Sequence, residues 1–500
     1  MAGVLARGRQ ERRAEEHHDD HDLAGARRRA PARNPLTRAL RTTPGKVLAG
    51  VAAVVVLAAG LGALVAVVSG SAGNGFGQIG SQDAPLVEQS TGLYFSVNDM
   101  DAQVANVLLT GNDAALAADR QEDLTTYAAD RRRAEQDVQQ VAVTAAANPV
   151  AQKAVGQVLD ALGRYEALAA ESILLNQRGN DPAGKPSAAT LNYFQQATDL
   201  MRTGVLPAAN SLTSSNAAAL TNAYAADKSA ADDGSGYVLV LGIAVVAALA
   251  GLQLFFARRY HRLFNPVLAA ATVVAAGLAI AGAAQLSAQA THLTVAKQDA
   301  FDSIIALTQA REISYDANAD ESRWLVDPAR ATMYQNSFLA KSQQIANVGN
   351  AGIFGYDAAF AADISAYQAN DADVRFGGYL GAEFRNITFP GERAAATSAL
   401  LAFQIYERDD RKLRALAKTN LDQAIAFDIG TSPGQSDWAF NNWAAALGKV
   451  TGINQNAFTA AIHDGNSTGS GWNGVIPAVA VAAIVVLTVA GTWRRLAEYR

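Results

Sequence analysis

Four long stretches without a charged residue constrain this chain more than any other feature. They cover residues 47–69, 237–257, 266–288 and 475–493 and contain no Asp, Glu, Lys or Arg. A helix needs about 20 apolar residues to cross the ~30 Å hydrocarbon core of a bilayer, and each stretch reaches that length. A soluble protein can bury one such helix, but it rarely contains four. The sequence therefore predicts four transmembrane helices in contact with the lipid bilayer.

The first stretch could instead belong to a cleaved signal peptide. The apolar region of a signal peptide is about 7–15 residues long and lies near the N-terminus. Here the apolar run is longer and follows 46 residues. We therefore expect it to stay in the protein as a membrane anchor.

The composition of the 500 residues excludes several classes of protein. Half of the residues are hydrophobic and 17% are charged, whereas disordered chains are poor in apolar residues. The absence of cysteine excludes a disulfide scaffold, a thiolate metal site and a cysteine nucleophile. The net charge of −5 argues against nucleic acid as a partner, because phosphate backbones are bound by basic surfaces.

Basic residues beside the apolar stretches predict the orientation in the membrane. Residues 1–46 contain eleven Lys and Arg against six acids, and residues 258–262 and 494–500 contain three arginines each. Short basic segments stay in the cytoplasm. We therefore expect a multi-pass protein of the plasma membrane with both termini in the cytoplasm. The long segments 70–236 and 289–474, with net charges of −9 and −6, then face outward.

Both long segments are expected to be helical. In the first of them, Leu93, Val97, Met100, Val104 and Val107 recur at steps of four and three, which is the spacing of a seam buried in an antiparallel bundle. The predicted fold is all-α, with four transmembrane helices and two extracytoplasmic antiparallel helical bundles in tandem. Its segments are a basic, disordered cytoplasmic segment (1–46), the transmembrane helices (47–69, 237–257, 266–288, 475–493), the outer bundles (70–236, 289–474), a cytoplasmic loop (258–265) and a cytoplasmic tail (494–500).

Two features interrupt the expected outer helices. Pro207 lies inside a helical pattern that begins near Ala188, and a proline there should kink or divide the helix. Residues 375–391 are rich in glycine and aromatic side chains. We expect them to form an insertion loop at the tip of the second bundle.

The joints between spans and outer segments differ in glycine content. Residues 70–80, 232–236 and 464–474 are glycine-rich, and each glycine weakens a helix by about 1 kcal/mol relative to alanine. We therefore expect soft joints there. Residues 266–326 contain no such break, so the third span should run straight into its outer helix and carry a signal.

No motif for catalysis or for cofactor binding is present. The sequence lacks a phosphate-binding loop, a dinucleotide fingerprint, a zinc-protease helix and a nucleophile elbow. Residues 17–22 contain three histidines and three aspartates, but we interpret them as a solvated charged segment. We expect a protein that is not an enzyme, with no catalytic residue, no cofactor and no metal site.

Two groups of residues are candidates for contacts with partners. The connection between the second and third spans could dock a cytoplasmic partner or could serve only topology and lipid contact: Arg258, Arg259, Tyr260, His261 and Arg262. A group on the first outer helix could recognise a partner or an amine ligand, or could be an ordinary helix surface beside the core: Tyr94, Phe95, Asp99 and Asp101.

Three short stretches carry a resemblance to a known family. They are residues 40–45, residues 93–105 and residues 316–322. With the four-span architecture, they resemble the actinobacterial GlnX-type membrane proteins. The resemblance implies a signalling protein that links an extracytoplasmic amino-acid-binding lipoprotein to the cytoplasmic serine/threonine protein kinase G. It implies no site residues for this chain.

Three functions from different classes are compatible with these features. The first is a signalling adaptor with a protein partner on each side of the membrane. The second is a direct sensor whose outer bundles bind a small molecule. The third is a scaffold of the cell envelope. Binding of a ligand by the protein alone favours the second, and capture of a binding lipoprotein favours the first.

Overall fold

The computed structural model describes residues 42–144, 149–260 and 265–497. Within these ranges the chain is helical and contains no strand, which confirms the predicted all-α class. The helices are α2 (Thr43–Gln78), α3 (Ala84–Thr110), α4 (Ala117–Thr144), α5 (Pro149–Gly179), α6 (Ala188–Leu200), α7 (Leu206–Tyr260), α8 (Pro266–Thr294), α9 (Asp302–Val326), α10 (Ala331–Ile345), α11 (Tyr356–Ala369), α12 (Gly378–Asn386), α13 (Glu392–Ala417), α14 (Leu421–Asp428), α15 (Ser436–Thr468) and α16 (Val475–Ala497).

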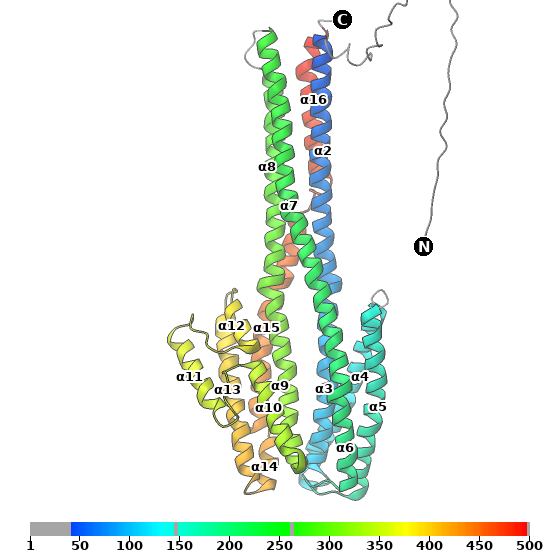
Figure 1. Ribbon diagram of the computed structural model, residues 1–500, viewed down its shortest axis with the longest axis vertical. Helices are drawn as coiled ribbons and strands as arrows, with labels where there is room; N and C mark the ends of the chain where they lie inside the picture. Colours follow the sequence, from blue (N-terminus) through cyan, green and yellow to red (C-terminus); the bar gives the residue numbers. More distant parts are fainter. Residues whose placement is uncertain (1–41, 145–148, 261–264, 498–500) are drawn as a thin grey trace, which may run out of the picture.

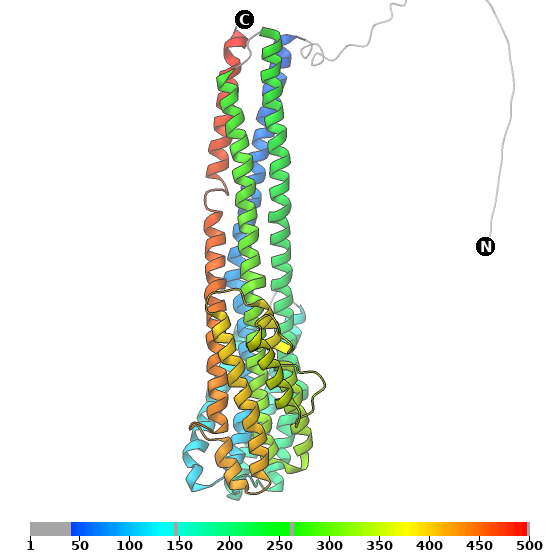
Figure 2. The same ribbon diagram turned by 90° about the vertical axis from the view of Figure 1, so that its left-hand side faces the viewer.

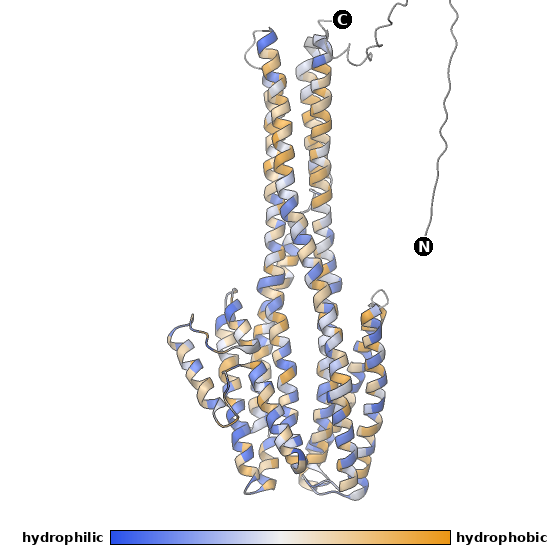
Figure 3. Cartoon of the chain, viewed as in Figure 1, coloured by the Kyte–Doolittle hydropathy of each residue, from blue (hydrophilic) through white to orange (hydrophobic). Residues whose placement is uncertain are grey.

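The molecule consists of a narrow stem and a wider helical head (Figure 1). The stem contains α2, α8, α16 and the C-terminal part of α7, and these helices share one hydrophobic core. Apolar residues run along the whole length of the stem, whereas the head mixes apolar and polar residues (Figure 3). Within the described residues, four helices are long and apolar enough to cross a membrane, as predicted.

Three of the four apolar helices continue without a break from the stem into the head. They span Thr43–Thr110, Ala188–Arg259 and Pro266–Val326, with 68, 72 and 61 residues. At 1.5 Å per residue these are rods of roughly 90–110 Å. The predicted continuity of the third span is confirmed, but it is shared by the first and second spans.

The prediction of soft joints at residues 70–80 and 232–236 is therefore wrong, because both segments lie inside continuous helices. Their glycines allow neighbouring helices to approach closely. A Cβ atom on Gly75 would lie 2.2 Å from Asp227 Oδ2, and one on Gly234 would lie 2.5 Å from Val68 Cγ1. Because α2 and α7 pack along each other, tertiary contact overrides the low helix propensity of glycine.

The fourth span does have the predicted break. Residues 469–474 form turns between α15 and α16, and Gly471 adopts a φ of +79° that suits glycine. Figure 2 shows this interruption between the two helices. The fourth span is thus joined to the head by a turn, whereas the other three are joined by helix.

Each of the three long helices contains one π-helical turn. These turns are Ile79–Asp83, Met201–Val205 and Val295–Phe301. The second ends two residues before Pro207, and the helix continues through the proline instead of dividing. A π turn changes the local hydrogen-bond pattern, so the chain can accommodate a residue without an N–H group there.

The head contains two main hydrophobic cores. The first is enclosed by α3, α4, α5, α6 and the start of α7, and the second by α9, α10, α11, α12, α13 and α15. The first core also includes residues from the second half of the chain, among them Leu325 and Phe427. The first core is therefore built from both halves of the chain.

Residues 375–391 do not form the loop that the sequence predicted. Residues Gly378–Asn386 fold into α12, which contributes Leu380 and Phe384 to the second core. The Asn386 side chain donates to the carbonyl oxygens of Gln298 and Asp299 in the third π turn. The segment thus packs at the end of the head nearest the stem instead of at its tip.

Candidate functional site

A buried group of charged side chains lies where α3 and α9 pack against each other. On α9, Asp316, Asp320 and Arg323 follow one another at steps of four and three, so they share one helix face. Arg323 donates to Asp316 Oδ1 at 2.9 Å and to Asp320 Oδ1 at 2.8 Å. It also donates to Asp101 Oδ2 of α3 at 2.7 Å. We call these residues, with Lys341, the interhelix charge cluster.

Lys341 of α10 completes the interhelix charge cluster. Its Nζ atom lies 2.7 Å from Asp316 Oδ2 and 2.5 Å from Asp320 Oδ2. On the other side, Thr198 of α6 donates to Asp101. Three carboxylates thus face two cations in a largely buried region, and four helices contribute to their pairing.

The pKa values of two acids of the cluster, Asp101 and Asp316, are shifted in opposite directions. Burial raises the pKa of the Asp101 carboxyl, although Arg323 and Thr198 act in the opposite direction. Burial also opposes ionisation of Asp316, but Lys341 and Arg323 outweigh it and hold the pKa of that carboxyl below its usual value. Asp316 is therefore firmly ionised, and its charge depends on both cations staying in place.

The buried polar contacts of α9 extend toward α13 and α14. Tyr406 donates to Glu321 Oε2 at 3.0 Å, and Ser322 donates to Asp428 Oδ2 at 3.0 Å. Burial, followed by the nearby Asp410 and Asp428, raises the pKa of Glu321 well above its usual value. Residues 316–323 thus connect α9 with four neighbouring helices, α3, α10, α13 and α14.

The four residues proposed as a recognition patch on the first outer helix do not lie together on an exposed surface. Asp101 is fully buried against Arg323, and Asp99 is almost fully buried. The pKa of Asp99 is raised well above its usual value by burial and by the charge of Asp130. The Phe95 ring stacks edge-on against Tyr315 of α9 at a centroid distance of 4.5 Å, and Tyr94 packs against the first core. These side chains therefore contact other helices and do not form one open patch.

The candidate contact between the second and third spans lies at the opposite end of the stem from the head. Arg258 and Arg259 are exposed in the last turn of α7, which ends at Tyr260. His261 and Arg262 lie outside the described residues. So do residues 1–41, with the histidine and aspartate group at 17–22, and the end of the tail, 498–500.

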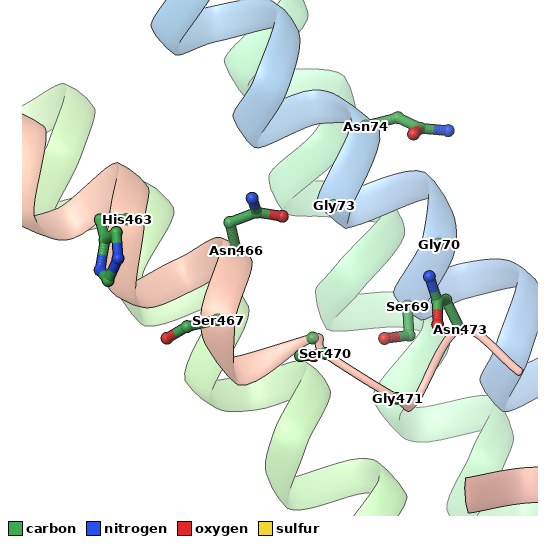
Figure 4. A pocket seen from close by; sticks show the side chains of 11 residues that line it. Ser69, Gly70, Gly73, Asn74, His463, Asn466, Ser467, Ser470, Gly471 and Asn473 are labelled. Carbon is green, nitrogen blue, oxygen red and sulfur yellow. The ribbon is translucent and has the colours of Figure 1, made fainter. Parts of the chain in front are cut away.

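A polar cleft of about 440 Å³ lies between α2 and the break that precedes α16 (Figure 4). Ser69 and Asn74 of α2 line it on one side, and Asn466 and Ser470 on the other. Gln285 of α8 donates to Ser69 Oγ at 3.2 Å. The cleft therefore offers neutral hydrogen-bonding groups at the boundary between stem and head.

The interhelix charge cluster was not predicted from the sequence. The sequence analysis used residues 316–322 only for the resemblance and gave them no role. A usable signal was present, because Asp316, Asp320 and Arg323 carry opposite charges on one face of a single helix. Its partner Asp101 was named as part of a candidate recognition patch, but its buried pairing with Arg323 was not predicted.

Comparison with known proteins adds one match. Residues 75–225 match the family model of the actinobacterial sensor domain. The matched region begins at the end of α2, contains the helices around the first core and ends within α7. None of the curated proteins and none of the solved structures matches the chain. The helical architecture and this match to part of the chain together support a sensor-type actinobacterial protein.

Proposed function

We propose that this protein is a non-enzymatic transmembrane signalling adaptor. It relays the state of an extracytoplasmic amino-acid-binding lipoprotein to a cytoplasmic serine/threonine protein kinase. The sensor-domain match to residues 75–225 supports a sensing role. The resemblance of residues 93–105 and 316–322 to GlnX-type proteins is the reason for choosing these two partners. Both stretches contribute residues to the interhelix charge cluster.

One observation carries this proposal. The interhelix charge cluster joins α3 to α9, and both helices continue directly into the stem as α2 and α8. A partner that changes the packing of α9 against α3 would therefore move two spans relative to each other. Such a partner must bind the two arrangements with different affinity, since a ligand shifts an equilibrium only by its differential affinity.

The far end of the stem supplies the output side of the proposed relay. Arg258 and Arg259 are exposed at the end of α7, and α7 is part of an unbroken helix from the head. A basic cluster at this position offers planar guanidinium groups to acidic side chains of a kinase. The positive-inside rule supports placing it in the cytoplasm.

Direct sensing of a small molecule is the second candidate function. It is favoured by a pocket between α3, α9 and α15 that contains charged groups of both signs. This pocket is the subject of the next section. The two functions are compatible, because both would act through the packing of α3 against α9.

Photo-crosslinking in native membranes tests the adaptor function. A photoreactive amino acid is placed in turn at Arg259 and at exposed apolar positions of the head: Val143, Leu159, Phe354 and Ile405. We expect the head positions to capture a solute-binding lipoprotein and Arg259 to capture a serine/threonine kinase. Capture of neither class from membranes that contain both would refute the proposal.

A further inference from the structure

A small pocket of about 230 Å³ lies between three helices of the head. Its walls come from α3, α9 and α15, and each of these helices leads toward a different span of the stem. The volume is below the ~300–1,000 Å³ typical of sites for drug-sized ligands. It therefore suits a molecule with only a few non-hydrogen atoms.

Glu312 of α9 lines this pocket and is almost completely buried, with 6% of its surface exposed. Its Oε1 atom has no hydrogen-bond partner within the described part of the chain. Burial raises the pKa of this carboxyl well above its usual value, and Arg311 lowers it by a smaller amount. A buried polar group without a partner costs about 1–3 kcal/mol, so a ligand that supplies the partner gains affinity.

Arg311 brings a positive group to the same pocket. Its guanidinium carbon lies 5.0 Å from the centre of the Phe95 ring and 5.8 Å from that of Tyr315. Stacking holds the planar group in place. Arg311 hydrogen-bonds to Tyr315 but forms no salt bridge with any residue that the structure describes. Its remaining N–H groups can therefore donate to a carboxylate in the two-pronged geometry that arginine favours.

The remaining walls combine a second acid with apolar surface. Glu88 of α3 lines the pocket opposite Glu312, and Phe95, Ile304 and Ile305 provide apolar contact. A ligand with only a negative charge would face two carboxyl groups, and a ligand with only a positive charge would face the guanidinium group of Arg311. Neither would have a favourable partner for every charged group of the pocket. A ligand that carries both charges satisfies both requirements.

We propose that this pocket binds a small zwitterion with a short apolar part. Its carboxylate pairs with Arg311, its ammonium group pairs with Glu312 and Glu88, and its apolar part rests on Phe95 and Ile304. Because the ligand contacts α3 and α9 together, its binding fixes their packing. The inference goes beyond the adaptor function, since binding here requires neither the lipoprotein nor the kinase.

Calorimetry on the purified full chain in lipid nanodiscs tests the ligand class. The zwitterionic probes are glycine, alanine and leucine. The matched probes that lack one charge are 3-methylbutylamine and 4-methylpentanoate. We expect at least one zwitterion to bind with a Kd of about 1 mM or tighter, and at least about tenfold more tightly than either singly charged probe. Binding of no zwitterion, or equal binding of a singly charged probe, would overturn the inference.

Two variants test the location of the site. Arg311→Gln and Glu312→Gln should each weaken zwitterion binding at least about tenfold, because each removes one charge-assisted contact. Glu312→Gln is nearly isosteric and removes a buried acid, so its melting temperature should not fall. Arg408→Gln, an exposed change on α13, is the matched control and should bind like the parent. Unchanged binding in both pocket variants would place the ligand elsewhere. These measurements contain no partner protein, so their failure would leave the crosslinking test of the adaptor function intact.

Discussion

Arg323 of α9 donates from Nη2 to Oδ2 of Asp101 of α3 at 2.7 Å, and both side chains are fully shielded from solvent. The two residues are 222 positions apart in the chain. The pair therefore ties the first half of the head to the second. Removing one partner of a buried pair leaves an uncompensated charge, and this is more costly than the pair is stabilising.

Arg323→Met should destabilise the protein by about 3–5 kcal/mol, because three buried carboxylates would lose their shared cation. Arg330→Met is the control. It breaks a pair with Asp199 at 2.9 Å that is partly exposed, and it should cost only about 0–1 kcal/mol. Chemical denaturation in detergent, followed by tryptophan fluorescence, measures both. Equal costs would mean that the Arg323 contacts do not join the two halves.

The stability of the head should depend on the protonation of Asp123 in α4. Burial, and then the nearby charge of Asp437, raises the pKa of Asp123 from 3.8 to about 8. The folded state then holds a proton that the unfolded state releases, so the contribution of Asp123 to stability falls as pH rises from about 4 to about 8.

Asp123→Asn should therefore be more stable than the parent at pH 9, by on the order of 1 kcal/mol, and should show less loss of stability between pH 5 and pH 8. Thermal unfolding across this pH range measures both. Asp160→Asn, at an exposed site on α5, is the control and should follow the parent. A pH profile of Asp123→Asn identical to the parent would contradict the assignment.

Close contact between α15 and α2 depends on Gly465. A Cβ atom at this position would lie 2.2 Å from the buried Phe76 ring. Gly465→Ala should destabilise the protein by about 1–3 kcal/mol, the usual cost of overpacking. Gly452→Ala on the same helix has no atom within 4 Å of the added Cβ and should stabilise it by roughly 0.5–1 kcal/mol. Melting temperatures that shift in the same direction would refute this account.

Helix continuity should be necessary for signal transmission. Insertion of three glycines after Gln289 or after Gly73 should uncouple head from stem, because each interrupts an unbroken helix. The same insertion after Gly471 falls in an existing turn and should have little effect. The readout is the stimulus-dependent state of the cytoplasmic partner in cells. Loss of response from all three insertions, or from none, would show that continuity is not what matters.

The predicted orientation can be tested because the chain contains no cysteine. His261→Cys should react with a membrane-impermeant thiol reagent only after the cells are opened. Phe354→Cys, at a highly exposed position of the head, should react in intact cells. The reverse pattern would invert the topology and remove the cytoplasmic assignment of Arg258 and Arg259.

The sequence predicted the parts of this fold that depend on local composition. Charge-free runs marked the four apolar helices. The behaviour of glycine at residues 70–80 was not predicted, because it depends on α7 lying alongside. The pairing of Arg323 with Asp101 was missed for the same reason. Which helix faces which is a property of tertiary packing, and one sequence without homologues does not reveal it.

The π turns at Ile79–Asp83 and Val295–Phe301 have a consequence for how the long helices are built. A helix advances about 100° per residue, so a turn that accommodates one additional residue offsets the angular phase of everything beyond it. In the stem, one face of α2 packs against the neighbouring helices. Beyond the π turn, the residues of α3 that would continue this face no longer point in the same direction. Each long helix thus consists of two segments on one axis, and the face that packs differs in angular phase between them. Deleting a single residue within either π turn would rotate the transmembrane part of that helix by about 100° relative to its part in the head.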